Sequence, residues 1–129
     1  MKEIIFAFAT DDRKNFTKEH FGEAKEYLIY KISKTESNLE AIITNVSPEE
    51  KMHGDPNKAK GVASILKPLD VKVLVSKAFG KNIVHQQKKF VVILSQNMNI
   101  HETIKNTQTT FDQIVTKWKE GTERGYLKI

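Results

Sequence analysis

Two short segments of this sequence carry a histidine among residues that could hold a ligand. The first contains His20, Phe21 and Gly22, and three lysines share it: Lys14, Lys18 and Lys25. A neutral imidazole is a good iron ligand, and lysines would offset the negative charge of an anionic cluster. The structural alternative is that His20 hydrogen-bonds within its loop while Phe21 fills the core. We expect Gly22 to supply a backbone conformation or close approach that a Cβ would block.

The second segment places His53 and Gly54 directly before an expected helix. Asp55 can cap the free amides of that helix, and Pro56 suits its first position. Because a helix N-terminus offers free amides and a partial positive charge, an anionic ligand that bridges His20 and His53 is physically reasonable. These two histidines are therefore the candidate metal ligands. The alternative for His53 is a solvated loop histidine.

A third segment, Gly80-Lys81-Asn82, opens a short expected helix and could cradle an anion. It lacks the spacing of a P-loop, and the alternative is an ordinary turn with a helix cap. His85 and His101 lie on expected helices without the spacing of metal ligands, so we interpret them as surface histidines.

Asp11 and Asp12 follow the first expected strand. In nucleases of the ribonuclease-H type an acidic residue on the first strand binds magnesium, whereas both of these lie beyond the strand. No convincing acidic partner stands on the later strands, and two-metal phosphoryl transfer needs several convergent carboxylates. A Ser-His-Asp arrangement is also missing. We therefore assign no catalytic residue and expect a protein that is not an enzyme.

The composition limits the classes of protein to which this chain can belong. The 129 residues are 39% hydrophobic and 29% charged, which is typical of one globular domain. The chain has no cysteine, which excludes disulfides and thiolate-ligated clusters. Its modest formal charge of +5 suggests anionic partners, and the alternative is a lysine-rich solvated surface. No apolar run approaches the length of a membrane helix, and the N-terminus does not read as a signal peptide. We expect a cytoplasmic protein without membrane contact.

The hydrophobic pattern predicts the elements that must position these segments. Five strands are expected, over residues 4–9, 27–32, 39–46, 71–75 and 90–94. Helices are expected from 56 to the residue before Pro68, over 80–89, and from the Asn99 cap to Trp118. The order β-β-β-α-β-α-β-α predicts a mixed five-stranded sheet in a ribonuclease-H-like, three-layer α/β domain over residues 1–118. Residues 119–129 are expected to be a flexible C-terminal tail.

Four stretches make residues 1–118 similar to the dinitrogenase iron–molybdenum cofactor biosynthesis family, which includes NifX- and NafY-type carriers and the C-terminal domain of NifB-type proteins. These stretches are Ala9-Thr10-Asp11-Asp12, His20-Phe21-Gly22-Glu23-Ala24 with the strand 27–30, His53-Gly54 with Gly61, and Val71–Val75 with Phe79-Gly80-Lys81-Asn82. The His-Phe-Gly-x-Ala segment, placed between the first two strands, is the most specific of them.

The resemblance implies a ribonuclease-H-like fold and a carrier that binds the iron–molybdenum cofactor or a precursor iron–sulfur cluster. It implies a binding site made of His20, Phe21, Gly22, His53, Gly54, Gly80, Lys81 and Asn82. Two loops depart from the family pattern: Ala78 and Lys81 replace the Gly and Pro of the usual Gly-x-Gly-Pro-Asn-Ala turn, and the loop 52–57 has fewer glycines. Imidazole ligation remains open without cysteine.

Three functional hypotheses follow. The first is a carrier of a metal cluster or related anionic ligand, whose partners would be cluster donor or acceptor proteins. The second is a protein-interaction or regulatory module that kept the fold and lost the cluster. The third, least favoured, is a nucleic-acid-binding protein, motivated by the charge of +5. The sequence is compatible with a monomer or a homodimer.

Overall fold

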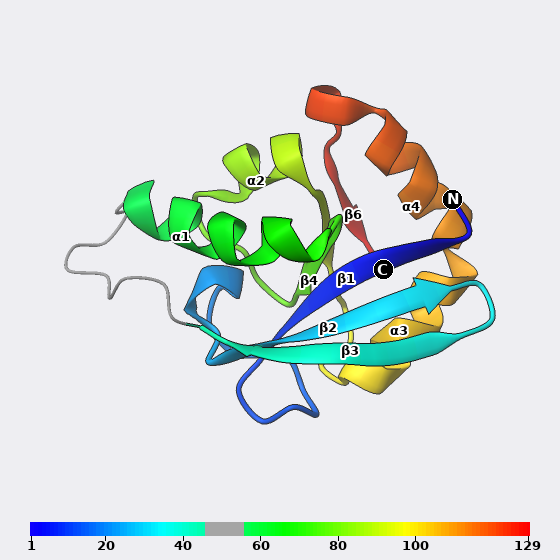
Figure 1. Ribbon diagram of the computed structural model, residues 1–129, viewed down its shortest axis with the longest axis horizontal. Helices are drawn as coiled ribbons and strands as arrows, with labels where there is room; N and C mark the ends of the chain where they lie inside the picture. The colour runs from blue at the N-terminus through cyan, green and yellow to red at the C-terminus, as the bar shows by residue number, and fades with distance from the viewer. Residues whose placement is uncertain (46–55) are drawn as a thin grey trace.

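The structure is a computed structural model that describes residues 1–45 and 56–129. It shows a mixed six-stranded sheet in the order β3-β2-β1-β4-β5-β6, with helices packed on both faces (Figure 1). The strands are β1 (Glu3–Thr10), β2 (Glu26–Ser33), β3 (Ser37–Thr44), β4 (Val73–Ser76), β5 (Val91–Leu94) and β6 (Tyr126–Lys128). The helices are α1 (Pro56–Leu66), α2 (Ile83–Lys89), α3 (Ile100–Thr109) and α4 (Phe111–Lys119). Three short 3₁₀ turns are η1 (Phe21–Glu23), η2 (Lys67–Leu69) and η3 (Gly121–Glu123).

The sheet has the mixed character that the element order predicts. Strands β1, β2 and β3 form an antiparallel meander, and β4 runs parallel to β1 on its other side. Strands β5 and β6 continue the parallel half. The predicted meander at one edge, with parallel strands beside the first strand, is therefore confirmed, but the sheet has six strands rather than five.

β1 is covered on both faces, since Ile4 and all the residues from Phe6 to Ala9 are apolar and buried. Phe6 and Phe8 face one core layer, which α3 and α4 cover. Ala7 and Ala9 face the opposite layer, beneath α1, where their small side chains leave room for Phe21. A continuous apolar run is typical of such a central strand, and this prediction is confirmed.

The long helix expected from Asn99 to Trp118 is wrong, because the chain breaks into α3 and α4 at Thr110. The Asn99 cap itself is confirmed, since its Oδ1 accepts the Glu102 amide at 2.9 Å. At the break, the Thr110 hydroxyl donates to the carbonyl of Asn106 at 2.8 Å, and its backbone leaves helical geometry at φ −100° and ψ 16°. Such back-bonding by threonine bends helices.

Residues 119–129, expected to be a flexible tail, instead contain η3 and the sixth strand. β6 pairs in parallel with β5, and the Ile129 amide donates to the carbonyl of Leu94 at 3.1 Å. Arg124 precedes the strand and is only 6% exposed. Its guanidinium donates to the carbonyls of Lys117, Trp118 and Gln87 and lies 4.7 Å from the Trp118 ring centroid. A strand of three residues is too short to give a periodic signal, so the sequence did not predict it.

Among the described residues, no helix is long and apolar enough to cross a bilayer.

Candidate ligand-binding site

The candidate residues lie on two loops that leave one edge of the sheet. The first loop follows β1 and leads through His20 to η1, and the second follows β4 and leads through Gly80 to α2. Because β1 and β4 are parallel neighbours, their carboxyl ends meet at the same edge. Ligands in α/β sheets commonly bind outside the carboxyl ends of strands.

Phe21 joins the two loops. Its backbone amide donates to the carbonyl of Ala78 at 2.9 Å, which ties the turn after β1 to the loop after β4. The ring is buried and stacks on Phe79, with the centroids 5.1 Å apart and the planes inclined by 8°. The Phe21 ring also contacts the Tyr27 ring, with the centroids 5.0 Å apart. The segments 20–22 and 78–80 are therefore one packed unit.

Tyr27 and Asn45 hold this turn from beneath, and the sequence reasoning missed both of them. The Tyr27 hydroxyl donates to the carbonyl of Phe21 at 2.8 Å. The Asn45 side-chain amide donates to the carbonyls of Gly22 and Ala24 at 3.0 and 2.8 Å. Burial raises the pKa of the Tyr27 phenol, so it stays a protonated donor at neutral pH. In the sequence, the roles of Tyr27 and Asn45 are indicated only by a polar side-chain atom near the end of an otherwise apolar strand.

His20 lies at the surface of the unit, with its side chain 55% exposed. Its Nδ1 is 3.6 Å from a carboxylate oxygen of Glu23, which is within ion-pair distance but longer than a hydrogen bond. The same atom lies against the backbone of Gly80, where an added Cβ would come within 3.0 Å of it. With the described residues, Nε2 forms no hydrogen bond or ion pair.

The expectation that Gly22 is the residue where a Cβ would be blocked is wrong. Gly22 does not adopt a positive φ, and an added Cβ would have only an ordinary contact with Val62, at 3.9 Å. The glycine that permits a close approach is Gly80, against His20. Sequence reasoning assigned the requirement to the wrong glycine because the contact joins residues sixty positions apart in the chain.

These two glycines provide a matched pair of substitutions. Gly80→Ala is expected to displace the His20 ring while leaving thermal unfolding nearly unchanged, because the clashing atom belongs to an exposed side chain that can rotate. Gly22→Ala is expected to leave the ring in place. Imidazole nitrogen and carbon chemical shifts of His20, measured by NMR, report its environment in each variant. Equal His20 shifts in both variants would contradict the assigned contact.

The other predicted site residues have different positions. His53 and Gly54 lie outside the described residues, so their role stays a prediction. Lys81 is exposed, and the Asn82 side chain does not cap α2. The carbonyl of Gly80 accepts the amide of Ile83 at 3.1 Å within the turn. His85 and His101 are exposed on α2 and α3, as expected for surface histidines.

Asp11 and Asp12 are occupied by bonds within the loop after β1. Asp11 accepts the Thr17 hydroxyl at 2.8 Å and the Lys25 amide at 2.9 Å. Asp12 accepts the amides of Asn15 and Lys14 at 2.7 and 2.9 Å, and these bonds lower the pKa of its carboxyl group. Both carboxylates therefore stabilise the loop. Within residues 1–45 and 56–129, no group of three or more His, Asp or Glu side chains could hold a metal ion.

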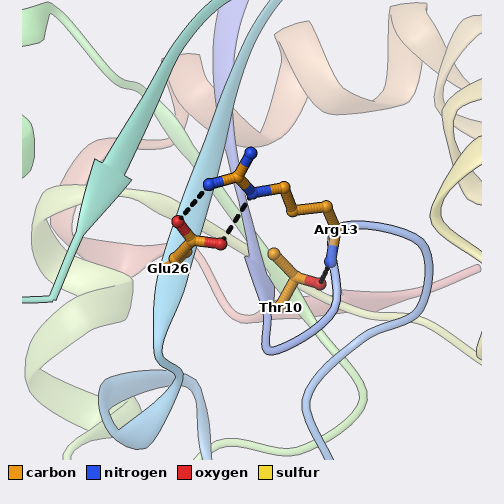
Figure 2. Close-up of polar contacts among 3 residues, drawn as sticks. All are labelled: Thr10, Arg13 and Glu26. Atoms are coloured by element: carbon orange, nitrogen blue, oxygen red, sulfur yellow. Dashed lines mark hydrogen bonds and ion pairs between the residues drawn. The ribbon is translucent and has the colours of Figure 1, made fainter.

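Arg13 forms a further clamp on this loop (Figure 2). Its backbone has a positive φ of 68°, and its amide donates to the Thr10 hydroxyl oxygen at 2.8 Å. The guanidinium forms two hydrogen bonds with Glu26 on β2, at 2.9 and 2.8 Å. These bonds lower the pKa of the Glu26 carboxyl group. The clamp fixes the start of the loop that leads to His20.

This arrangement defines an α/β domain with a mixed six-stranded sheet, whose candidate site lies on the loops that follow β1 and β4. Residues 2–121 match the sequence model of the family described as dinitrogenase iron-molybdenum cofactor, so the chain belongs to that family.

The fold is also similar to the NMR structure of a Methanococcus jannaschii protein proposed to be a dinitrogenase. The TM-score is 0.58 at 16% identity, and the match covers 86% of this chain and 92% of that one. At this identity the likeness shows the fold alone. No curated protein matches the sequence.

Proposed function

We propose that this chain is a non-enzymatic carrier domain that binds an iron–molybdenum cofactor, a precursor iron–sulfur cluster or a related anionic ligand. Membership of the family supports the class of ligand. The single observation that carries the proposal is the position of His20 beside Gly80, where its Nε2 has no bond to any residue that the structure describes. Gly80, Lys81 and Asn82 would form the opposite side of the site, and His53 and Gly54, which precede α1 in the sequence, would contribute further contacts.

One imidazole fits a preformed cluster better than a bare metal ion. A bare transition-metal ion needs about four protein ligands, and the described residues offer no such group. A cluster brings its own sulfides, so a single imidazole can fill one open coordination position. Glu23 lies on the Nδ1 side of His20, where a carboxylate orients a ligating ring and favours coordination through Nε2.

Surface charge also suits an anionic ligand. Lys18 precedes His20 by two residues, and Lys81 directly follows Gly80. Both lysines are exposed, and neither forms an ion pair with the described residues. Lysines at this distance stabilise an anion through long-range attraction and need no fixed contact.

Anaerobic titration with isolated iron–molybdenum cofactor or precursor cluster tests the proposal. His20→Ala is expected to weaken binding about tenfold or more, because the cluster would lose one coordinating nitrogen. His101→Ala, an exposed histidine on α3, serves as the control and should bind as the unmodified chain does. X-ray absorption should show a nitrogen ligand that disappears in His20→Ala. If a His20→Ala/His53→Ala double variant binds with unchanged affinity, neither histidine is a ligand of the cluster.

A second function is a protein-interaction or regulatory module of the same family. The observation that favours it is the altered loop after β4, where Ala78 and Lys81 replace family residues and Ala78 is committed to the Phe21 amide. Failure to take up any cluster anaerobically, together with a stable protein partner, would favour this function over the carrier.

A further inference from the structure

β3 is an edge strand whose outer side has no partner among the described residues. The sheet order begins with β3, which pairs only with β2 among the described strands. All its residues are exposed or half-buried. Edge strands are commonly protected by lysines, prolines or β-bulges. β3 has no lysine or proline, its single charge, Glu40, pairs with Lys31 on β2 at 3.5 Å, and its one protective irregularity is a β-bulge.

A β-bulge brings the two exposed large apolar side chains of this strand, Leu39 and Ile42, to one face. Ala41 is opposite Ile29 and Leu39 is opposite Tyr30, so Glu40 is an extra residue in β3. In a regular strand, Leu39 and Ile42 would lie on opposite faces because their spacing is odd. The bulge reverses this relation. Both now lie on the face of the α3–α4 core layer, 48% and 36% exposed.

We propose that β3 pairs with β3 of a second copy, antiparallel, about a two-fold axis between Glu40 and Ala41. In this register, Leu39 lies opposite the partner's Ile42, and each pair of opposed residues shares a face of the sheet. A shift of one or two residues in either direction opposes at least one pair from different faces. The strand is therefore complementary to itself in a single register, as a closed two-fold interface requires.

The side chains also favour this register. Leu39 of each copy packs against Ile42 of the other, so this contact occurs twice across the axis and removes the surface of these side chains from water. Glu40 lies opposite the partner's Ala41, so the two carboxylates do not directly face each other. The inference is independent of the ligand proposed for His20, because the strand edge and that site use different residues.

Sedimentation equilibrium tests the interface in solution. The unmodified chain is expected to show twice the mass of one chain at micromolar concentration. Leu39→Lys/Ile42→Lys places like charges directly opposite and should raise the dimer dissociation constant at least about tenfold. Val84→Lys/Tyr126→Lys, which changes two exposed apolar residues outside β3 in the same way, should stay dimeric. Circular dichroism checks that both variants remain folded.

Cross-linking tests the register, because the chain has no cysteine of its own. Ser37 and Thr44 are exposed at opposite ends of β3 and lie directly opposite each other across the proposed axis. Mixed Ser37→Cys and Thr44→Cys chains should form a disulfide on mild oxidation. Either variant alone should not, since its two cysteines would be about 23 Å apart at roughly 3.3 Å per residue. A monomer at all concentrations, or equal cross-linking of single and mixed samples, would overturn the proposal.

Discussion

Phe21→Ala is expected to lower the free energy of unfolding by about 3–5 kcal/mol, which is the cost of truncating a large buried aromatic side chain. Phe21 is only 1% exposed and packs against both Phe79 and Tyr27. Its removal leaves a cavity where the turn after β1 meets the loop after β4. Urea denaturation followed by circular dichroism measures the loss.

Two milder variants separate the contributions of the Phe21 ring and its surroundings. Phe79→Ala should cost less, because Phe79 is only partly buried and solvent can fill the space. Tyr27→Phe keeps the aromatic packing and removes one buried hydrogen bond to the Phe21 carbonyl, at a cost of about 1 kcal/mol. A smaller loss for Phe21→Ala than for Phe79→Ala would contradict the role of Phe21 as the anchor of the site.

Arg124→Ala is expected to lower the free energy of unfolding by about 3 kcal/mol, a value typical of losing several hydrogen bonds from one buried charged donor. The guanidinium ties the carbonyls at the end of α4 to that of Gln87 on α2, and it covers the Trp118 ring. Its loss leaves these carbonyls without their donor. Amide hydrogen exchange should show the β6 amides losing protection before those of β1.

Arg13→Ala is the matched control for Arg124, since it removes the same side chain from the surface. Arg13 also forms a two-bond contact with a partner, Glu26, but its side chain is 58% exposed. Exposed pairs contribute little to stability because water and salt screen them. The loss should therefore be much smaller than for Arg124. Comparable losses in both variants, or unchanged protection of β6 in Arg124→Ala, would show that Arg124 does not hold the C-terminal strand.

Local sequence determined much of this protein. The run of apolar residues at 4–9 predicted a central strand covered on both faces, and the Asn99 cap predicted the start of α3. The order of strands and helices predicted a meander followed by parallel strands. The His20-Phe21-Gly22 segment pointed to the family that the comparison of residues 2–121 then established. The strand and the cap depend on neighbouring residues alone, where periodicity and capping act, whereas the topology and the family depend on the order of such local segments along the chain.

The tertiary structure decided the features that depend on distant contacts. In the folded chain His20 packs against Gly80, so the close approach occurs at Gly80 and not at Gly22. The side chains of Tyr27 and Asn45 hold the turn through hydrogen bonds to its carbonyls. The tertiary structure also placed the last residues in a sixth strand, through the buried Arg124. A three-residue strand has no period of its own, and a glycine shows no sign of what approaches it. These features exist only once the sheet has brought remote segments together, so no local pattern could reveal them.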